Sequence, residues 1–451
     1  MSILKNSFFL LITIAFFSCQ NILESSRPNV ILIMADDIGY ECIGVNGSNS
    51  YITPVLDSLS NHGIRFTNAY SQPLCTPSRV KIMTGKPNYE NYEYFGYLGS
   101  DRKTFGNLFK DNGYNTAVVG KWQLNGLSYK LKDHKKMSKP LDFGFDEYSL
   151  WQLSHPRDSN KERFANPKIE QNGKILETNI SDYGPDIVSN YAIDFIRRNR
   201  DNPFFLYYPM ILVHDPFSPT PDSEIWKEES KRNINDTKYY SDMITYMDKI
   251  IGKIINELKE NSILENTLLI FIGDNGTHPN IISINNGQEI KGAKGNTIKY
   301  GTNVPMFVNW DSQINKSFTS HSLIGFEDFY TTFEDILKVS KIKSSGISFL
   351  NLLNGKDFNE RKVLNSYYDS RWGARVNKFR SVYSQTTEYK LYKNGKFFNI
   401  KEDPMEIAHI DILTTEQRQI KSMLKEELDK IPDLEENSKY IWENKRIKDY
   451  R

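Results

Sequence analysis

The sequence is poor in cysteine and in net charge. Its three cysteines, Cys19, Cys42 and Cys75, are an odd number and show no short metal-binding spacing. They therefore indicate neither a disulfide framework nor a cysteine-based zinc site. The 57 Lys and Arg residues balance 56 Asp and Glu residues to a net charge of +1. Since no whole-chain field favours nucleic acid or an anionic membrane, we expect no nucleic-acid partner, and any anion must be recognised locally.

The chain also lacks an apolar run near its N-terminus that is long enough to cross a bilayer. Residues 8–17 are apolar except for Thr13, follow Lys5, and predict a signal peptide over residues 1–18. The sequence Phe-Phe-Ser-Cys at 16–19 resembles a bacterial lipobox, which implies lipidation of Cys19 and a tether over residues 19–27. We expect an exported lipoprotein, anchored by this lipid alone at the cell surface or in the periplasm. The alternative is an ordinary secretory signal in which Cys19 is incidental.

Four apolar runs are present and predict parallel strands that are covered on both faces, at residues 30–34, 114–119, 204–208 and 267–272. Helical patterns lie between them: one begins at Thr53 and Pro54, one at Thr104, and two others cover residues 187–196 and 240–258. The alternation predicts an α/β fold, a large and mostly parallel sheet between layers of helices, over residues 28–342.

Polar residues follow the ends of these strands. Because ligands of such sheets bind beyond the carboxyl ends of the strands, we expect these residues to converge: Asp36, Asp37, Lys121, His214, Asp274 and Asn275. A single acidic residue after a strand is more often a turn or helix cap. Two separate clusters of carboxylate and carboxamide are harder to explain in that way.

The pattern changes towards the C-terminus. Short runs at 363–368, 389–392 and 397–400, with Asn394-Gly395 as a hairpin turn, predict an antiparallel sheet with a helix over residues 415–431. We therefore expect a smaller α+β domain over residues 343–451. The lysine-rich stretch 130–139 has no apolar period and is expected to be a solvated loop. Cys42 is expected to be a buried small side chain.

The segment Cys75-Thr76-Pro77-Ser78-Arg79, followed by a helical stretch ending in Thr84-Gly85, resembles the signature of the type I sulfatases in the alkaline phosphatase superfamily. Pro77 suits a first helical turn, so residue 75 is expected at a helix N-terminus, where backbone N–H groups favour an anion. The resemblance implies that a maturation enzyme oxidises Cys75 to formylglycine (3-oxoalanine), whose hydrate is the nucleophile.

The resemblance also implies the roles of other residues. One calcium ion would be held by the residue 75 hydrate and by oxygen donors of the kind that calcium prefers: Asp36, Asp37, Asp274 and Asn275. Arg79 would hold the hydrate, Lys121 and Lys294 would bind the sulfate, and His214 would protonate the leaving alcohol. Lys291 is an alternative to Lys294 in the register of the motif.

Two positions depart from the family pattern. Gln123 stands where a histidine is usual, and it can hydrogen bond to substrate but cannot accept a proton at neutral pH. Phe217 replaces a second histidine, which indicates a changed substrate pocket. His278, close after Asn275, either reaches the site or is an exposed loop residue.

These features predict a sulfatase that acts on oligosaccharides of a sulfated polysaccharide, for example an algal, ulvan-like one. Export and an aromatic content of 13% favour a carbohydrate substrate. Two alternatives remain: a phosphodiesterase or phosphonate hydrolase of the same superfold, and a glycan-binding relative that has lost turnover through Gln123.

Overall fold

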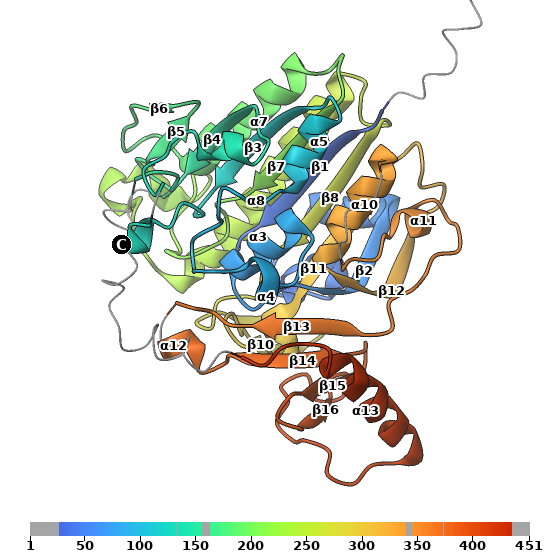
Figure 1. The fold of residues 1–451 in the computed structure, drawn as a ribbon. Helices are drawn as coiled ribbons and strands as arrows, with labels where there is room; N and C mark the ends of the chain where they lie inside the picture. Colours follow the sequence, from blue (N-terminus) through green and yellow to red (C-terminus); the bar gives the residue numbers. More distant parts are fainter. Residues whose placement is uncertain (1–26, 132, 156–162, 340–344, 373, 435–451) are drawn as a thin grey trace, which may run out of the picture.

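A computed structural model describes residues 27–131, 133–155, 163–339, 345–372 and 374–434 (Figure 1). The expected signal peptide, Cys19 and the expected domain boundary at 342/343 lie outside these residues and stay predictions. Within the described ranges, no helix combines the length and the apolar character that a membrane crossing requires.

The larger part of the chain is built on one mixed sheet. The strand order is β12-β2-β11-β8-β1-β7-β3-β4-β5-β6. Neighbours pair in parallel except where β11 and β5 take part. The strands are β1 (Asn29–Ala35), β2 (Ile64–Tyr70), β3 (Asn115–Lys121), β4 (Glu147–Trp151), β5 (Ile169–Gln171), β6 (Lys174–Ile175), β7 (Phe204–Pro209), β8 (Thr267–Gly273), β11 (Asn303–Asn309) and β12 (Phe318–Gly325). The prediction of a large, mostly parallel sheet is confirmed.

Helices cover both faces of this sheet (Figure 1). Along β1, Ile31 and Ile33 point into one apolar core, while Leu32 and Met34 point into the other, as the two-residue period of a strand requires. The first core is shared with α2 (Pro54–His62), α7 (Gly184–Arg198) and α8 (Tyr240–Glu260). The second is shared with α3 (Cys75–Thr84), α5 (Phe105–Asp111) and α10 (Glu327–Leu337). Burial on both faces explains why the central strands read as continuous apolar runs.

The helix starts at Thr104 and Thr53 differ in how they are capped. Thr104 forms a capping box with Asn107 at the start of α5. Thr53 is in the expected N-cap position but makes no capping hydrogen bond. Asp248 of α8 takes this role instead, since its carboxylate accepts the N–H groups of Val55 and Leu56, each at 2.9 Å. Here a tertiary contact replaces the local cap that the sequence suggests.

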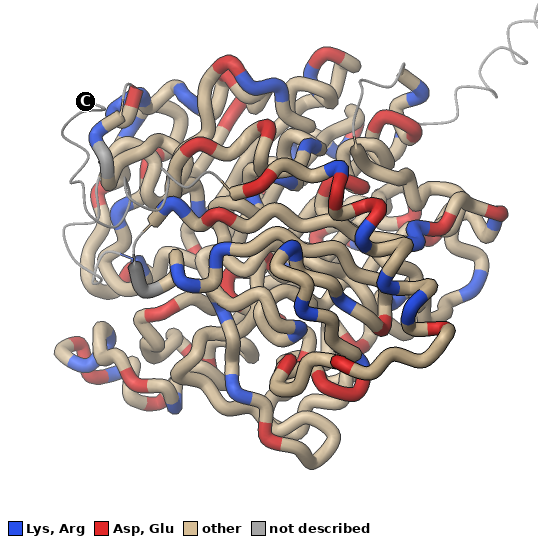
Figure 2. The backbone as a smooth tube through the Cα atoms, turned by 60° about the horizontal axis from the view of Figure 1, so that its bottom comes forward, with Lys and Arg blue, Asp and Glu red and all other residues tan. Residues whose placement is uncertain are grey.

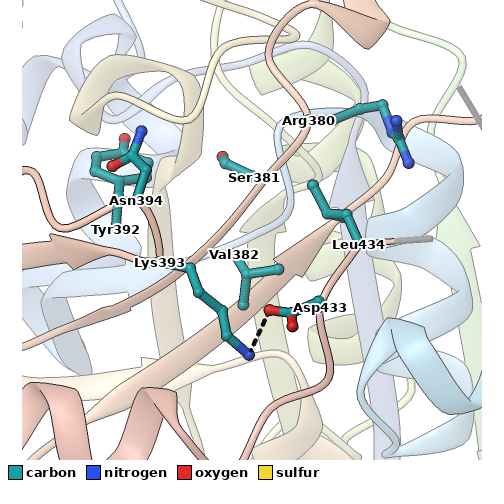
Figure 3. Close-up of a pocket in the computed structure, with 8 residues that line it drawn as sticks. All are labelled: Arg380, Ser381, Val382, Tyr392, Lys393, Asn394, Asp433 and Leu434. Atoms are coloured by element: carbon teal, nitrogen blue, oxygen red, sulfur yellow. Dashed lines mark ion pairs between the residues drawn. The ribbon is translucent and has the colours of Figure 1, made fainter. Parts of the chain in front are cut away.

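The smaller C-terminal part contains the predicted antiparallel sheet. Its strands are β13 (Leu364–Tyr368), β14 (Ser381–Gln385), β15 (Tyr389–Tyr392) and β16 (Phe397–Asn399), and α13 (Thr415–Leu428) packs on them. Lys393 pairs with Asp433 at 3.0 Å beside a shallow pocket, so the segment after α13 is held against the β15–β16 hairpin (Figure 3).

Short elements complete the chain. They are α4 (Asn88–Asn91), α6 (Lys139–Asp142), α9 (Lys299–Thr302), α11 (Leu350–Leu353), α12 (Ala374–Asn377), the hairpin of β9 (Ile282–Asn285) and β10 (Gln288–Lys291), and several 3-10 turns. Figure 2 shows Lys and Arg residues interspersed with Asp and Glu residues along the backbone, in line with the balanced net charge.

The expectation of a solvated loop over residues 130–139 is wrong for its last residue, Lys139. The Lys139 side chain is buried, and its Nζ donates to the Leu124 carbonyl at 3.2 Å and lies 4.3 Å from the centre of the Tyr97 ring. Burial lowers the pKa of Lys139 to about 8. A carbonyl and an aromatic face thus replace water around a cation in this interior position.

Lys139 gives a prediction about pH. Its pKa is 10.5 when solvated and about 8 in the fold, so between these values the unfolded chain binds more protons than the folded one. The contribution of Lys139 to the free energy of unfolding therefore rises with pH between these two pKa values. We expect the melting temperature of the wild type to rise relative to that of Lys139→Met over the window, as measured by scanning calorimetry. If the difference in melting temperature between the two proteins does not change with pH, the lowered pKa of the buried Lys139 is contradicted.

Candidate active site

The carboxyl edge of the sheet gathers the residues that the sequence places at strand ends. Lys121 ends β3, and its Nζ lies 2.8 Å from both carboxylate oxygens of Asp36, which follows β1. Asp274 follows β8 and accepts from Arg79 of α3, at 3.1 Å from Nη2 and 3.3 Å from Nε. The structure thus brings together groups that are up to 238 residues apart in the chain.

Cys75 lies at the centre of this edge, as the first residue of α3. Its side chain is 2% exposed, and its Sγ, one oxygen of Asp36 and one of Asp274 all lie within 4.8 Å of one another. All ten residues of α3 are buried, and the helix ends at Gly85, which has a φ of 65°. The backbone of residue 75 is therefore held firmly, with the positive end of the helix dipole directed towards this residue.

The oxygen donors of the site suit a hard divalent cation. Asp36, Asp37 and Asp274 are completely buried, and Asn275 Oδ1 is buried without a hydrogen-bond partner in the described part of the chain. The amide of Asn275 is oriented by donation from Nδ2 to Asp37 Oδ1 at 2.9 Å. A buried amide oxygen without a partner, beside three carboxylates, is a donor set that fits calcium.

The electrostatics of these carboxylates depend on the cations beside them. Although burial alone would raise it, the charge of Lys121 holds the pKa of Asp36 well below its usual range. Burial and the neighbouring Asp36 raise the pKa of Asp274 to about 7. Burial also raises the pKa of the Cys75 thiol, so an unmodified Cys75 is protonated and a poor nucleophile.

His214 and Lys294 form the second side of the site. His214 Nε2 lies 3.0 Å from Lys294 Nζ and 3.6 Å from Asp37 Oδ2, while Lys294 Nζ lies 2.5 Å from the same Asp37 oxygen. The other ring nitrogen, Nδ1, lies 2.9 Å from Asp215 Oδ1. Burial, reinforced by Arg163, lowers the pKa of His214, so the imidazole is mostly neutral at pH 7.

Arg163 is a site residue that the sequence does not reveal. One Nη donates to Nδ1 of His214 and to the carbonyl of Asp215, and the guanidinium lies 4.2 Å from the centre of the Trp151 ring. Arg163 is 2% exposed. The surrounding sequence has neither a motif nor a hydrophobic period, so nothing in it indicates this contact.

The remaining candidates are placed differently. Gln123 has Oε1 at 3.8 Å from Cys75 Sγ and is in the left-handed region with a φ of 54°. Lys291 is exposed on β10, away from these contacts, whereas Lys294 reaches Asp37. His278 packs edge-on against Phe217 with ring centres 5.5 Å apart. Cys42 is buried as expected, but among polar groups, with Sγ 3.2 Å from Thr277 Oγ1.

The fold matches that of known proteins. A large, mostly parallel sheet between helices, with a smaller antiparallel sheet after it, is the fold of the alkaline phosphatase-like class. A solved structure titled for the metabolism of multiple glycosaminoglycans by Bacteroides thetaiotaomicron superposes with a TM-score of 0.73, at 21% identity over 90% of this chain and 99% of that one. The phosphonate monoester hydrolase of Agrobacterium radiobacter superposes with a TM-score of 0.67, at 17% identity over 90% and 95%.

The family follows from the sequence comparison. The family model described as Sulfatase matches residues 28–339, and the one described as N-sulphoglucosamine sulphohydrolase, C-terminal, matches residues 297–433. The chain belongs to the sulfatase family. Human N-acetylgalactosamine-6-sulfatase is 30% identical over 362 residues, which cover 72% of this chain and 65% of the human protein.

Proposed function

We propose that this protein hydrolyses sulfate esters on oligosaccharides of a sulfated polysaccharide. The observation that carries the proposal is the arrangement at Cys75, where a helix N-terminus, three buried carboxylates and two lysines surround one side chain. Such a site gives an anion both positive charge and fixed hydrogen-bond donors in surroundings that exclude water. Formylglycine at residue 75 would supply a nucleophilic oxygen, and a calcium ion held by Asp36, Asp37, Asp274 and Asn275 would supply charge that neutralises a sulfate oxygen.

The side chains around residue 75 have distinct tasks in this proposal. Lys121 and Lys294 donate to the sulfate oxygens and stabilise the charge that they carry. Arg79 orients the group at residue 75, because it is fixed by Asp274 and by donation to the Lys121 carbonyl at 3.0 Å. Since Asp215 and Arg163 occupy Nδ1 of His214, its Nε2 is the nitrogen that is left for the leaving alcohol, and the protonated form of the imidazole supplies the proton once Lys294 has turned to the sulfate.

The carbohydrate class is supported by the names of similar proteins. The human relative acts, by its name, on N-acetylgalactosamine 6-sulfate, and the solved structure of highest similarity reported above concerns glycosaminoglycans. Within this class we propose an algal, ulvan-like polysaccharide as the source of the substrate. Chondroitin sulfate, which contains sulfated N-acetylgalactosamine, serves as a comparison because the name of the human relative gives this sugar.

Sulfate release with and without a chelator tests the proposal. Protein co-produced with a formylglycine-generating enzyme is incubated with fragments of ulvan, carrageenan and chondroitin sulfate, and free sulfate is measured by ion chromatography. We expect release from at least one substrate, loss of release with EGTA, and recovery with excess calcium, because the buried carboxylates need a cation to hold the reacting sulfate. Absence of release from every fragment, with formylglycine verified by mass spectrometry, would refute the sulfatase proposal.

The two alternatives give different results in the same experiment. A phosphonate or phosphodiester hydrolase, which the similarity to the Agrobacterium enzyme favours, would turn over an aryl phosphodiester faster than an aryl sulfate. A glycan-binding relative would bind fragments without releasing sulfate. In that case Gln123→His, which places an imidazole near residue 75, would be expected to restore release.

A further inference from the structure

Trp372 differs from the other tryptophans of the described chain. Its side chain is 47% exposed, whereas Trp122, Trp151, Trp226 and Trp310 are between 1% and 9% exposed. One face of the Trp372 ring is covered by Phe95, with ring centres 4.4 Å apart and planes 10° from parallel. The exposed area therefore belongs mainly to the opposite face and the ring edge. A large apolar face is left in water although a partner already holds the ring in place.

This aromatic pair adjoins the nucleophile. Phe95 is 5% exposed and belongs to the same apolar cluster as Leu74, Cys75 and Tyr368. The next residue, Gly96, donates its N–H to the hydroxyl of Thr76 in the first turn of α3, at 3.1 Å. Packing contacts thus run from the cluster of Cys75 and Phe95 to Trp372, so the exposed ring is separated from that cluster by one stacking contact.

Hydrogen bonds of the two residues before Trp372 hold its loop in place. Tyr92 donates its hydroxyl to the Ser370 carbonyl at 2.6 Å, and Arg371 donates to the carbonyls of Tyr92 and Glu93 at 3.0 and 3.2 Å. These bonds join the loop after β13, in the C-terminal part, to the loop after α4, in the large part. Figure 1 shows α12, which follows this loop, near the end of the sheet that holds the site. The ring is therefore positioned before any ligand arrives.

The charged side chains near Trp372 are paired with one another. Asp369 pairs with Arg371 at 3.2 Å and with Arg380 at 2.7 Å, and the pKa of Arg371 is raised by this carboxylate despite burial. The exposed aromatic face itself carries no charge. It suits a ligand with an apolar face and hydroxyl groups round its edge, which describes a pyranose ring.

We propose that Trp372 stacks against the sugar ring next to the sulfated one and so makes this protein an oligosaccharide-specific enzyme. The inference rests on the proposed sulfatase function and adds a subsite to it. The sulfated ring occupies the space above residue 75, and the adjoining ring lies on the exposed face of Trp372. Stacking of this kind binds substrate and transition state alike, so it lowers KM without changing kcat.

A substrate size series tests the subsite. For the polysaccharide that gives sulfate release, kcat and KM are compared for its sulfated monosaccharide and tetrasaccharide. We expect Trp372→Ala to raise KM for the tetrasaccharide about tenfold with kcat unchanged, and to leave both constants for the monosaccharide within about twofold. Trp372→Phe should keep most of the affinity. Equal losses on both substrates, or no loss on the tetrasaccharide, would overturn the proposal.

A control and a binding measurement separate this inference from the proposed function. Phe318→Ala removes another exposed aromatic ring, 38% exposed, from the first residue of β12, an edge strand of the large sheet, and should change neither constant. If the wild type releases no sulfate, calorimetry with sulfated tetrasaccharides of each of the three polysaccharides tested above still decides. Binding that Trp372→Ala weakens about tenfold supports the subsite without turnover, and absence of binding, or binding that Trp372→Ala leaves unchanged, rejects it.

Discussion

Replacement of Cys75 by alanine is expected to lower kcat/KM for sulfate release by at least about 10⁴-fold, because alanine has no thiol through which Cβ can be oxidised to formylglycine, the group whose hydrate would supply the nucleophilic oxygen. The two lysines, the carboxylates and His214 would remain in place, so substrate binding should persist. We expect the tetrasaccharide affinity of Cys75→Ala, measured by calorimetry, to lie near the KM of the wild type. The loss would then be in kcat, as for an interaction made only during reaction.

The second described cysteine provides a matched control. Cys42 is buried like Cys75, but it lies beside Thr277 and Tyr240, with Sγ 3.6 Å from the tyrosine hydroxyl, and not at a helix N-terminus. Burial raises the pKa of Cys42 far above its usual range, which makes it inert. Cys42→Ala should keep kcat and carry formylglycine at residue 75. An active Cys75→Ala protein, or an inactive Cys42→Ala protein of unchanged melting temperature, would contradict this assignment.

The central part of the fold is predictable from the sequence because its strands are buried on both faces. Four apolar runs correspond to β1, β3, β7 and β8, and these strands place the residues of the site. The strands β2 and β12 carry no such run, and the run of β11 is interrupted by Pro305. The first four residues of the edge strand β12 are mostly exposed or half-buried and its last four are buried, while β11 has a register shift between Val304 and Met306, on either side of Pro305. In a sequence, a proline within an apolar run indicates that a central strand is interrupted there, unless the irregularity that accommodates the proline is known.

The site was predictable only where a motif or a strand end marks a residue. Arg163, and Trp372 of the proposed subsite, have no such mark, since each is positioned by contacts between segments far apart in the chain. The register between Lys291 and Lys294 is another example. Three residues separate two lysines in a glycine-containing stretch, and only the packing shows that Lys294 reaches Asp37 while Lys291 is exposed.

Lys294→Ala is expected to lower kcat for sulfate release by about 10²–10³-fold, the usual effect of removing one charged donor from a reacting oxygen. The side chain of Lys294 is 10% exposed, and although burial alone would lower it, Asp37 raises its pKa, so it is fully protonated throughout the working range. Lys291→Ala removes a charge of the same sign from an exposed position three residues away and should leave kcat unchanged. Equal effects of the two substitutions on kcat would show that any nearby positive charge serves, and that direct donation from Lys294 to the reacting sulfate does not matter.

The same two variants show whether Lys294 acts on the reacting sulfate or mainly stabilises the fold through its ion pair with Asp37. In the chelated protein Lys294 compensates the buried Asp37 carboxylate at 2.5 Å, and removal of one partner of a buried ion pair typically costs about 3–5 kcal/mol. Bound calcium would compensate Asp37 in the absence of the lysine. We therefore expect Lys294→Ala to lower the melting temperature more in EGTA than in calcium, while Lys291→Ala lowers it in neither. A loss of kcat in saturating calcium with a wild-type melting temperature would assign the effect to the reacting sulfate, whereas a melting temperature lowered equally in both conditions would show that Lys294 mainly supports the fold.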